Sequence, residues 1–126
     1  MNAEQFLLVK IAEEAAEVAQ IALKTAQFGS FERMNETTPT NVERLNGELN
    51  DLIAVAFYIF NHYQEVRTKD GLTPLQIDAT LVKNKVEKIR KYYNYSAKLG
   101  LVEKDDKFIK DLNNLVNNGF NFLNPV

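Results

Sequence analysis

Apolar residues recur every three or four positions along most of this chain, which is the spacing of one face of an α-helix. Glycines and prolines lie mostly between these periodic segments, where they end or start helices. The pattern predicts four helices, over about 3–27, 40–67, 79–98 and 105–116. Amphipathic helices joined by short connections favour an antiparallel helical bundle, so we predict an all-α, four-helix-bundle-like fold.

Two of the predicted helices are apolar on more than one side. In the first, the stripe through Leu8, Ile11 and Val18 is widened by apolar residues on its flanks, which predicts contacts with several neighbours and hence an oligomer. In the second, residues 52–60 are apolar all round, which predicts a buried central helix. Thr40 and Glu43 have the spacing of a capping box at the start of that helix.

The length of 126 residues predicts one domain over 1–126, with a core over about 4–102 and a short helix and tail over 103–126. The net charge of -2 at pH 7 gives no basic surface for nucleic acid. The absence of cysteine excludes disulfides and thiolate metal sites. The longest apolar run would form a helix of about 13.5 Å, well short of a bilayer core of about 30 Å. With no signal peptide visible, we expect a cytoplasmic protein without membrane contact.

Two pairs of carboxylates stand out from this background. Glu14 and Glu17 are three residues apart in the first predicted helix, and Glu48 and Asp51 are three residues apart in the second. Residues at this spacing lie on one helix face, so two facing helices would gather four carboxylates in one small volume. Such a gathering of like charges is stable when divalent cations bind between them. Gly47 directly precedes Glu48 and interrupts a helix, which indicates close approach of a ligand or of another helix.

Other metal centres fit the chain less well. A di-iron bundle needs a Glu-x-x-His motif in each of two helices, but the only histidine is His62 and Ile59 lies three residues before it. Zinc lacks its usual cysteine and histidine ligands. Oxygen-only ligands favour Mg²⁺, with Mn²⁺ as a possible substitute. The remaining alternative is a non-catalytic helical dimerisation or adaptor module, whose carboxylates are ordinary solvated surface charge.

The two carboxylate pairs, with the segments Ala12–Gln20 and Glu48–Leu52 around them, resemble the MazG-type all-α nucleoside triphosphate pyrophosphohydrolases, and in particular their short, single-domain phage members. The family motif is ExxE, a spacer, and then ExxD on the next helix. Many relatives carry glycine where this chain has Asn50. The resemblance spans about residues 4–102. It implies Mg²⁺-dependent cleavage of a nucleoside triphosphate, expected to be a deoxynucleotide, to monophosphate and pyrophosphate by a homodimer or homotetramer, in the host cytoplasm if the chain is phage-encoded.

The resemblance also implies roles for individual residues. Glu14, Glu17, Glu48 and Asp51 would bind the metal, and Glu13 or Glu17 would orient or deprotonate the attacking water, whose pKa the metal lowers. On the predicted helix over 79–98, Lys85 and Arg90 match the family's phosphate-binding cations, whereas Ile89 stands where an asparagine is expected. A solvated basic face explains these cations equally well. Apart from the resemblance, three aromatic residues are candidates for stacking on the base, because aromatic side chains border many nucleotide sites: Phe28, Phe31 and Tyr92. For each of them, packing in the core or in a loop is the alternative.

Overall fold

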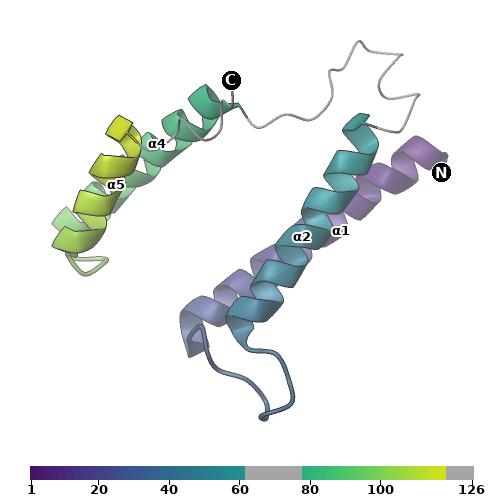
Figure 1. Cartoon of the computed structure of the whole chain (residues 1–126), viewed down its shortest axis with the longest axis horizontal. Helices are drawn as coiled ribbons and strands as arrows, with labels where there is room; N and C mark the ends of the chain where they lie inside the picture. The colour runs from purple at the N-terminus through teal and green to yellow at the C-terminus, as the bar shows by residue number, and fades with distance from the viewer. Residues whose placement is uncertain (62–77, 119–126) are drawn as a thin grey trace. The chain divides into compact units, whose positions relative to one another are not determined.

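The computed structural model describes residues 1–61 and 78–118, and every regular element in these ranges is an α-helix. The elements are α1 (Ala3–Phe28), α2 (Asn41–Asn61), α4 (Ala79–Lys98) and α5 (Asp106–Asn118) (Figure 1). The described residues contain no strand, which confirms the all-α class. Contacts divide the chain into two compact units, Met1–Leu75 and Gln76–Val126, and each unit is described by itself below.

Helix α1 begins and ends where its flanking residues supply caps. The Asn2 side chain accepts a hydrogen bond from the Gln5 N–H at 2.8 Å, and the Gln5 side chain accepts one from the Asn2 N–H at 2.9 Å. This reciprocal pair is a capping box, which satisfies N–H groups that a helix start leaves unbonded. The helix ends at Gly29, whose φ of +100° lies in a region that only glycine adopts readily. The predicted helix over 3–27 and its glycine stop are confirmed.

Helices α1 and α2 lie side by side and run in opposite directions (Figure 1). Their less exposed residues recur at alternating spacings of four and three, the pattern of an antiparallel coiled-coil seam. We call these residues the seam: Leu7, Ile11, Glu14, Val18 and Ile21 on α1, and Asn41, Leu45, Glu48, Leu52, Val55 and Ile59 on α2.

The seam on α1 is rotated from the stripe that the sequence predicts. Leu8 and Ala15, which belong to the predicted stripe, are exposed, whereas Glu14 lies within the covered face. The apolar surface of α1 is wide enough to offer a partner helix more than one docking face. The pattern of apolar residues therefore identified the helix but not the face against which α2 packs.

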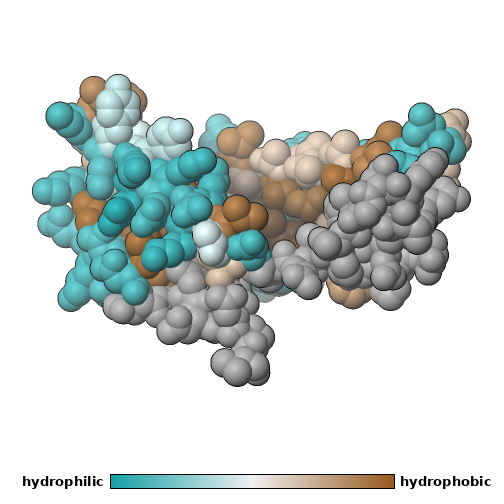
Figure 2. Space-filling model, turned by 90° about the horizontal axis from the view of Figure 1, so that it is seen from above, coloured by the Kyte–Doolittle hydropathy of each residue, from teal (hydrophilic) through white to brown (hydrophobic). Residues whose placement is uncertain are grey.

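The sequence predicts that the apolar stretch of α2 is buried all round, but the structure buries only one side of it. Ile59 is 1% exposed, whereas Ile53 is 59% and Phe57 50% exposed. The reason is geometric, because one partner helix covers one face of α2 and leaves the other faces uncovered within the hairpin. Hydrophobic side chains accordingly reach the visible surface of the molecule (Figure 2). The predicted stretch of helix over 62–67 and the side chain of His62 lie outside the described residues.

A buried asparagine closes the loop between α1 and α2. Asn41 is 1% exposed, and its Nδ2 donates to the Gly29 carbonyl at 3.0 Å and to the Glu32 carboxylate at 2.7 Å. Its backbone N–H donates to the Glu32 carbonyl at 3.0 Å. Next to it, the Thr40 hydroxyl accepts from the Glu43 N–H at 3.3 Å and donates to the Glu43 carboxylate at 3.0 Å, which bears out half of the predicted capping box. The start of α2 is thereby fixed to the loop that precedes it.

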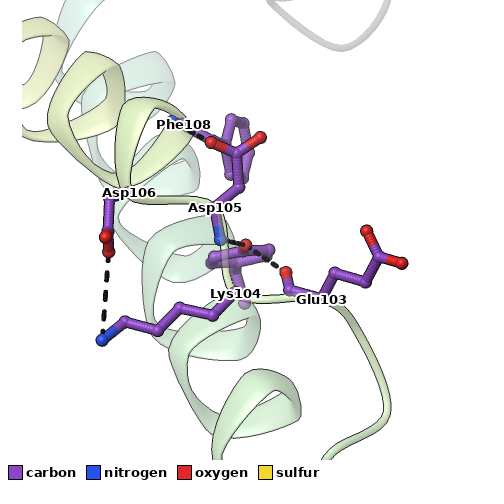
Figure 3. A network of polar contacts seen from close by, with 6 residues as sticks. Glu103, Lys104, Asp105, Asp106 and Phe108 are labelled. Carbon is purple, nitrogen blue, oxygen red and sulfur yellow. Dashed lines mark hydrogen bonds and ion pairs between the residues drawn. The ribbon is translucent and has the colours of Figure 1, made fainter.

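The second unit pairs α4 with α5. The Asp78 side chain accepts from the Leu81 N–H and caps α4, whose bounds agree with the predicted helix over 79–98. The Tyr93 hydroxyl donates to the Glu103 carbonyl and accepts from the Asp105 N–H, holding the α4–α5 connection that Figure 3 shows. The Tyr93 ring also contacts Phe108 edge to face at 4.8 Å between centroids. Among the described residues, no helix combines the length and apolar character needed to cross a bilayer.

Replacing Asn41 should destabilise the protein. Asn41→Ala removes the buried amide that donates to the Gly29 carbonyl and the Glu32 carboxylate, and the loss of such hydrogen bonds costs about 1–3 kcal/mol. Asn41→Asp should cost more, because it places a carboxylate against the Glu32 carboxylate and the Gly29 carbonyl. Urea unfolding measures the free energy of unfolding of both variants. The control is Asn46→Ala at an exposed position of the same helix, whose free energy of unfolding should stay within about 0.5 kcal/mol of that of wild type. Equal stabilities of the Asn41 and Asn46 variants would refute the role assigned to the buried amide.

Gly47 should be replaceable without strain in the hairpin. A Cβ built at this position meets no described atom within 4 Å, so the approach of another helix, which the sequence suggested, is not found among the described residues. Gly47→Ala should raise the free energy of unfolding by about 0.5–1 kcal/mol, since alanine favours the helix. A loss of stability in urea unfolding would show that something does press on this position in solution.

Candidate metal centre

Three of the four predicted metal ligands come together between α1 and α2. Glu14, Glu17 and Glu48 each offer a carboxylate oxygen, and these oxygens lie within 4.8 Å of one another. Two oxygens bound to one octahedral Mg²⁺ at about 2.1 Å lie about 3.0–4.2 Å apart. These separations fall within the observed limit of 4.8 Å, so the three oxygens are close enough to share one ion.

Two carboxylate oxygens in this cluster are buried and lack a partner. Glu14 Oε2 and Glu48 Oε2 are shielded from solvent and accept no hydrogen bond. Glu14 and Glu48 are both seam residues, so the opposite helix covers them. A buried acceptor without a donor is unfavourable, and a carboxylate more so than a neutral group. A bound cation or a retained proton removes this penalty.

Burial and crowding raise the pKa of two of these carboxyl groups above its ordinary value. For Glu48 the largest cause of the raised pKa is a hydrogen bond with the Glu17 carboxyl group, followed by loss of solvent and the charges of Glu17, Asp51 and Glu14. For Glu14 the pKa is raised first by loss of solvent, then by the charges of Glu17 and Asp51. Glu14 and Glu48 therefore hold protons more tightly than isolated glutamates do, as crowded carboxylates generally do.

The other two predicted carboxylates lie outside this group of three. Asp51 is exposed, but its charge helps raise the pKa of Glu14 and of Glu48, so it acts on the cluster from its edge. Glu13 is exposed and forms an ion pair with Lys10 at 3.0 Å. The hydrogen bond that the Lys10 ammonium donates to the Glu13 carboxylate is the largest cause of the raised pKa of Lys10. Glu13 therefore pairs with Lys10 on α1 and does not belong to the cluster.

A hollow of about 350 Å³ adjoins the cluster. It is lined by Glu17, Gln20, Ile21, Lys24, Arg44 and Glu48. Lys24 and Arg44 did not emerge as site residues from the sequence. A signal was present for Lys24, because Glu14, Glu17, Ile21 and Lys24 follow one another at spacings of three and four and so lie along one face of α1.

The predicted phosphate and base contacts lie apart from the cluster in the chain. Phe28 ends α1 and Phe31 lies in the following loop, and both are exposed. Lys85 and Tyr92 are exposed on α4, in the second unit. Arg90 is engaged within that unit, where Nη1 donates to the Asn113 side chain at 3.0 Å. Lys85 lines a shallow hollow on α4 with Lys88 and Lys91.

Comparison with protein-family models, curated proteins and solved structures gives no match for this chain. The resemblance to MazG-type enzymes therefore stays a prediction that rests on the carboxylate motif. The geometry adds an independent fact, which is that three of the four motif carboxylates meet in space.

The metal-free protein should lose stability as the pH rises above the ordinary glutamate pKa of 4.5. Because the pKa values of Glu14 and Glu48 are raised on folding, the folded state binds more protons than the unfolded state between 4.5 and the raised values, so stability falls as pH climbs through this window. Glu48→Gln removes one of these charges. In EDTA, its melting temperature should exceed that of wild type at pH 7.5, and the difference should shrink towards pH 4.5.

The matched control is Glu13→Gln, which removes a carboxylate from the same helix as Glu14 but outside the cluster. Its melting curve should keep the pH dependence of wild type. Parallel pH profiles for wild type and Glu48→Gln would contradict the account of the crowded cluster.

Proposed function

We propose that this protein is a Mg²⁺-dependent nucleoside triphosphate pyrophosphohydrolase, which converts a nucleoside triphosphate and water to the monophosphate and pyrophosphate. The observation that carries the proposal is the meeting of Glu14, Glu17 and Glu48, with two buried oxygens that no donor satisfies. A solvated helix face, the alternative reading of these glutamates, does not account for carboxylate oxygens shielded in a helix seam.

The donor set suits a hard divalent cation. All candidate ligands are carboxylate oxygens, which Mg²⁺ and Mn²⁺ prefer. In this proposal Glu14, Glu17 and Glu48 would hold the ion, and the exposed Asp51 would add its charge from the edge of the cluster. When bound, the metal would neutralise phosphate charge and acidify water. Two of the proposed ligands offer an oxygen that is shielded from water, and electrostatic contributions to catalysis are larger where water is excluded.

Glu17 is the better candidate of the two for accepting the proton of the attacking water. It belongs to the cluster and is exposed, so a water molecule can reach its carboxylate. Glu13, the alternative, is held by Lys10. A bond forms between the water oxygen and the α-phosphorus as the bond to the bridging oxygen breaks. Pyrophosphate leaves with that electron pair, and the water proton passes to a carboxylate oxygen of Glu17.

The remaining features of the proposal follow from the family resemblance. The substrate is expected to be a deoxynucleoside triphosphate, and the active form a homodimer or homotetramer. Uncovered apolar side chains on α1 and α2, such as Leu23 and Ile53, are compatible with further helices packing against the hairpin.

Phosphorus NMR on the purified chain with Mg²⁺ and the four ribo- and four deoxynucleoside triphosphates tests the proposal. We expect monophosphate and pyrophosphate as products. Glu48→Gln and Asp51→Asn should lower turnover by about 100-fold or more, since even residues that only support metal ligands are worth about 10–100-fold. Glu13→Gln should keep turnover close to wild type, because Glu13 lies outside the cluster.

Other outcomes separate the competing functions. Release of orthophosphate would keep a metal centre but refute cleavage between the α- and β-phosphates. An adaptor module predicts no turnover and no response to Mg²⁺ beyond that of ionic strength. A pyrophosphohydrolase predicts a melting temperature that rises with Mg²⁺, by an amount equivalent to about 2.7 kcal/mol at 100 times Kd, and this rise should be lost in Glu48→Gln.

A further inference from the structure

The charged face between α1 and α2 continues beyond the carboxylates. On α1 it runs from Glu14 and Glu17 to Lys24, and on α2 from Asp51 and Glu48 back to Arg44. Because the helices are antiparallel, the two cations lie at the same end of the face, and both line the hollow that Glu17 and Glu48 also line. The face is therefore divided by sign, with negative charge towards one end and positive charge towards the other.

Neither cation has a partner in the part of the chain that the structure describes. The ion pairs found there are Lys10 with Glu13 and Lys104 with Asp106. No hydrogen bond of the Lys24 ammonium or the Arg44 guanidinium is found in residues 1–61 and 78–118 either. Two like charges that converge on one hollow repel each other, and the Glu17 and Glu48 carboxylates in the same lining offset part of this repulsion until they hold a metal ion. An anion in that hollow removes the repulsion and gains charge-assisted hydrogen bonds from both.

The same two side chains also border a second hollow, of about 380 Å³, under the loop between α1 and α2. Arg33, Met34 and Thr38 belong to its lining, and Asn41 holds its wall in place through the bonds described above. Lys24 and Arg44 thus lie where the two hollows adjoin, and Arg33 adds a third cation to the second hollow, whose lining also includes the Glu32 carboxylate that accepts from Asn41. Three cations therefore line the two hollows, and two of them are shared by both.

We propose that Lys24 and Arg44 bind the β- and γ-phosphates of the substrate, the group that leaves as pyrophosphate. This assignment rests on the proposed function, which places the scissile bond at the carboxylate cluster. Charge develops on the bridging oxygen as the bond breaks, and the cations next to the cluster stabilise it there. Arg44 can bind phosphate oxygens in pairs through its planar guanidinium, and Lys24 acts as a single charge.

Isothermal titration calorimetry with inorganic pyrophosphate and Mg²⁺ tests the assignment on the full chain. Lys24→Gln and Arg44→Gln should each raise the Kd for pyrophosphate by about tenfold or more, the loss expected of one charge-assisted contact. Lys24→Arg keeps the charge and should stay within about threefold of wild type. Arg44→Lys keeps the charge but loses the paired contacts of the guanidinium, so its Kd should lie between that of wild type and that of Arg44→Gln. The matched control is Lys10→Gln on the same helix, because Lys10 pairs with Glu13 and lines neither hollow.

A second titration, with a deoxynucleoside monophosphate, distinguishes the two ends of the substrate. Its Kd should change by less than about twofold in the Lys24 and Arg44 variants. An equal loss for monophosphate and pyrophosphate would overturn the assignment to the leaving group, and an unchanged pyrophosphate Kd, or no binding by wild type, would overturn the site itself. If pyrophosphate binding depends on both cations but no triphosphate is cleaved, the anion site stands and the proposed reaction fails. Cooperative melting of each variant shows that it is folded.

Discussion

Two glutamates in a helix seam impose the main constraint on this structure. Coiled-coil seams are normally filled by apolar side chains, and Glu14 and Glu48 take positions that leucine or isoleucine would fill elsewhere. Each places a carboxylate oxygen out of reach of water and of any donor. Apolar contacts such as those of Ile21 and Ile59 offset this cost. The hairpin thus exchanges some of its own stability for a concentrated negative charge, a common trade at functional sites.

Local signals in the sequence were sufficient to predict the helices. Gly29 and Gly100 both adopt positive φ and end α1 and the α4 region where the pattern indicated. The convergence of Glu14, Glu17 and Glu48 was also predictable, because the spacing of three residues places each pair on one face of its helix and consecutive helices usually lie next to each other. The rotation of α1 that places Glu14 in the seam was not, since leucine, isoleucine and alanine on several sides of the helix offer near-equivalent docking faces.

The cations were missed for a different physical reason. A single lysine or arginine on a helix is usually a solvated surface residue, and neither Lys24 nor Arg44 belongs to a motif. Their significance arises only when two segments that are far apart in sequence lie together, which places them on one hollow. The role of Asn41 could not be predicted for the same reason. An asparagine at a helix start usually caps the helix, whereas here its side chain donates to Gly29 and Glu32 in the preceding loop.

The hairpin between α1 and α2 has a consequence for how the protein is made. All the carboxylates and cations of the two hollows come from one continuous stretch, residues 14–51. Contacts between segments near in sequence form quickly, because little chain entropy is lost in closing the loop. Synthesis proceeds from the N-terminus at about 5–20 residues per second. The ribosome therefore synthesises every residue of the charged face before it adds the first residue of α4, so the carboxylates and the cations of this face can meet without the second unit.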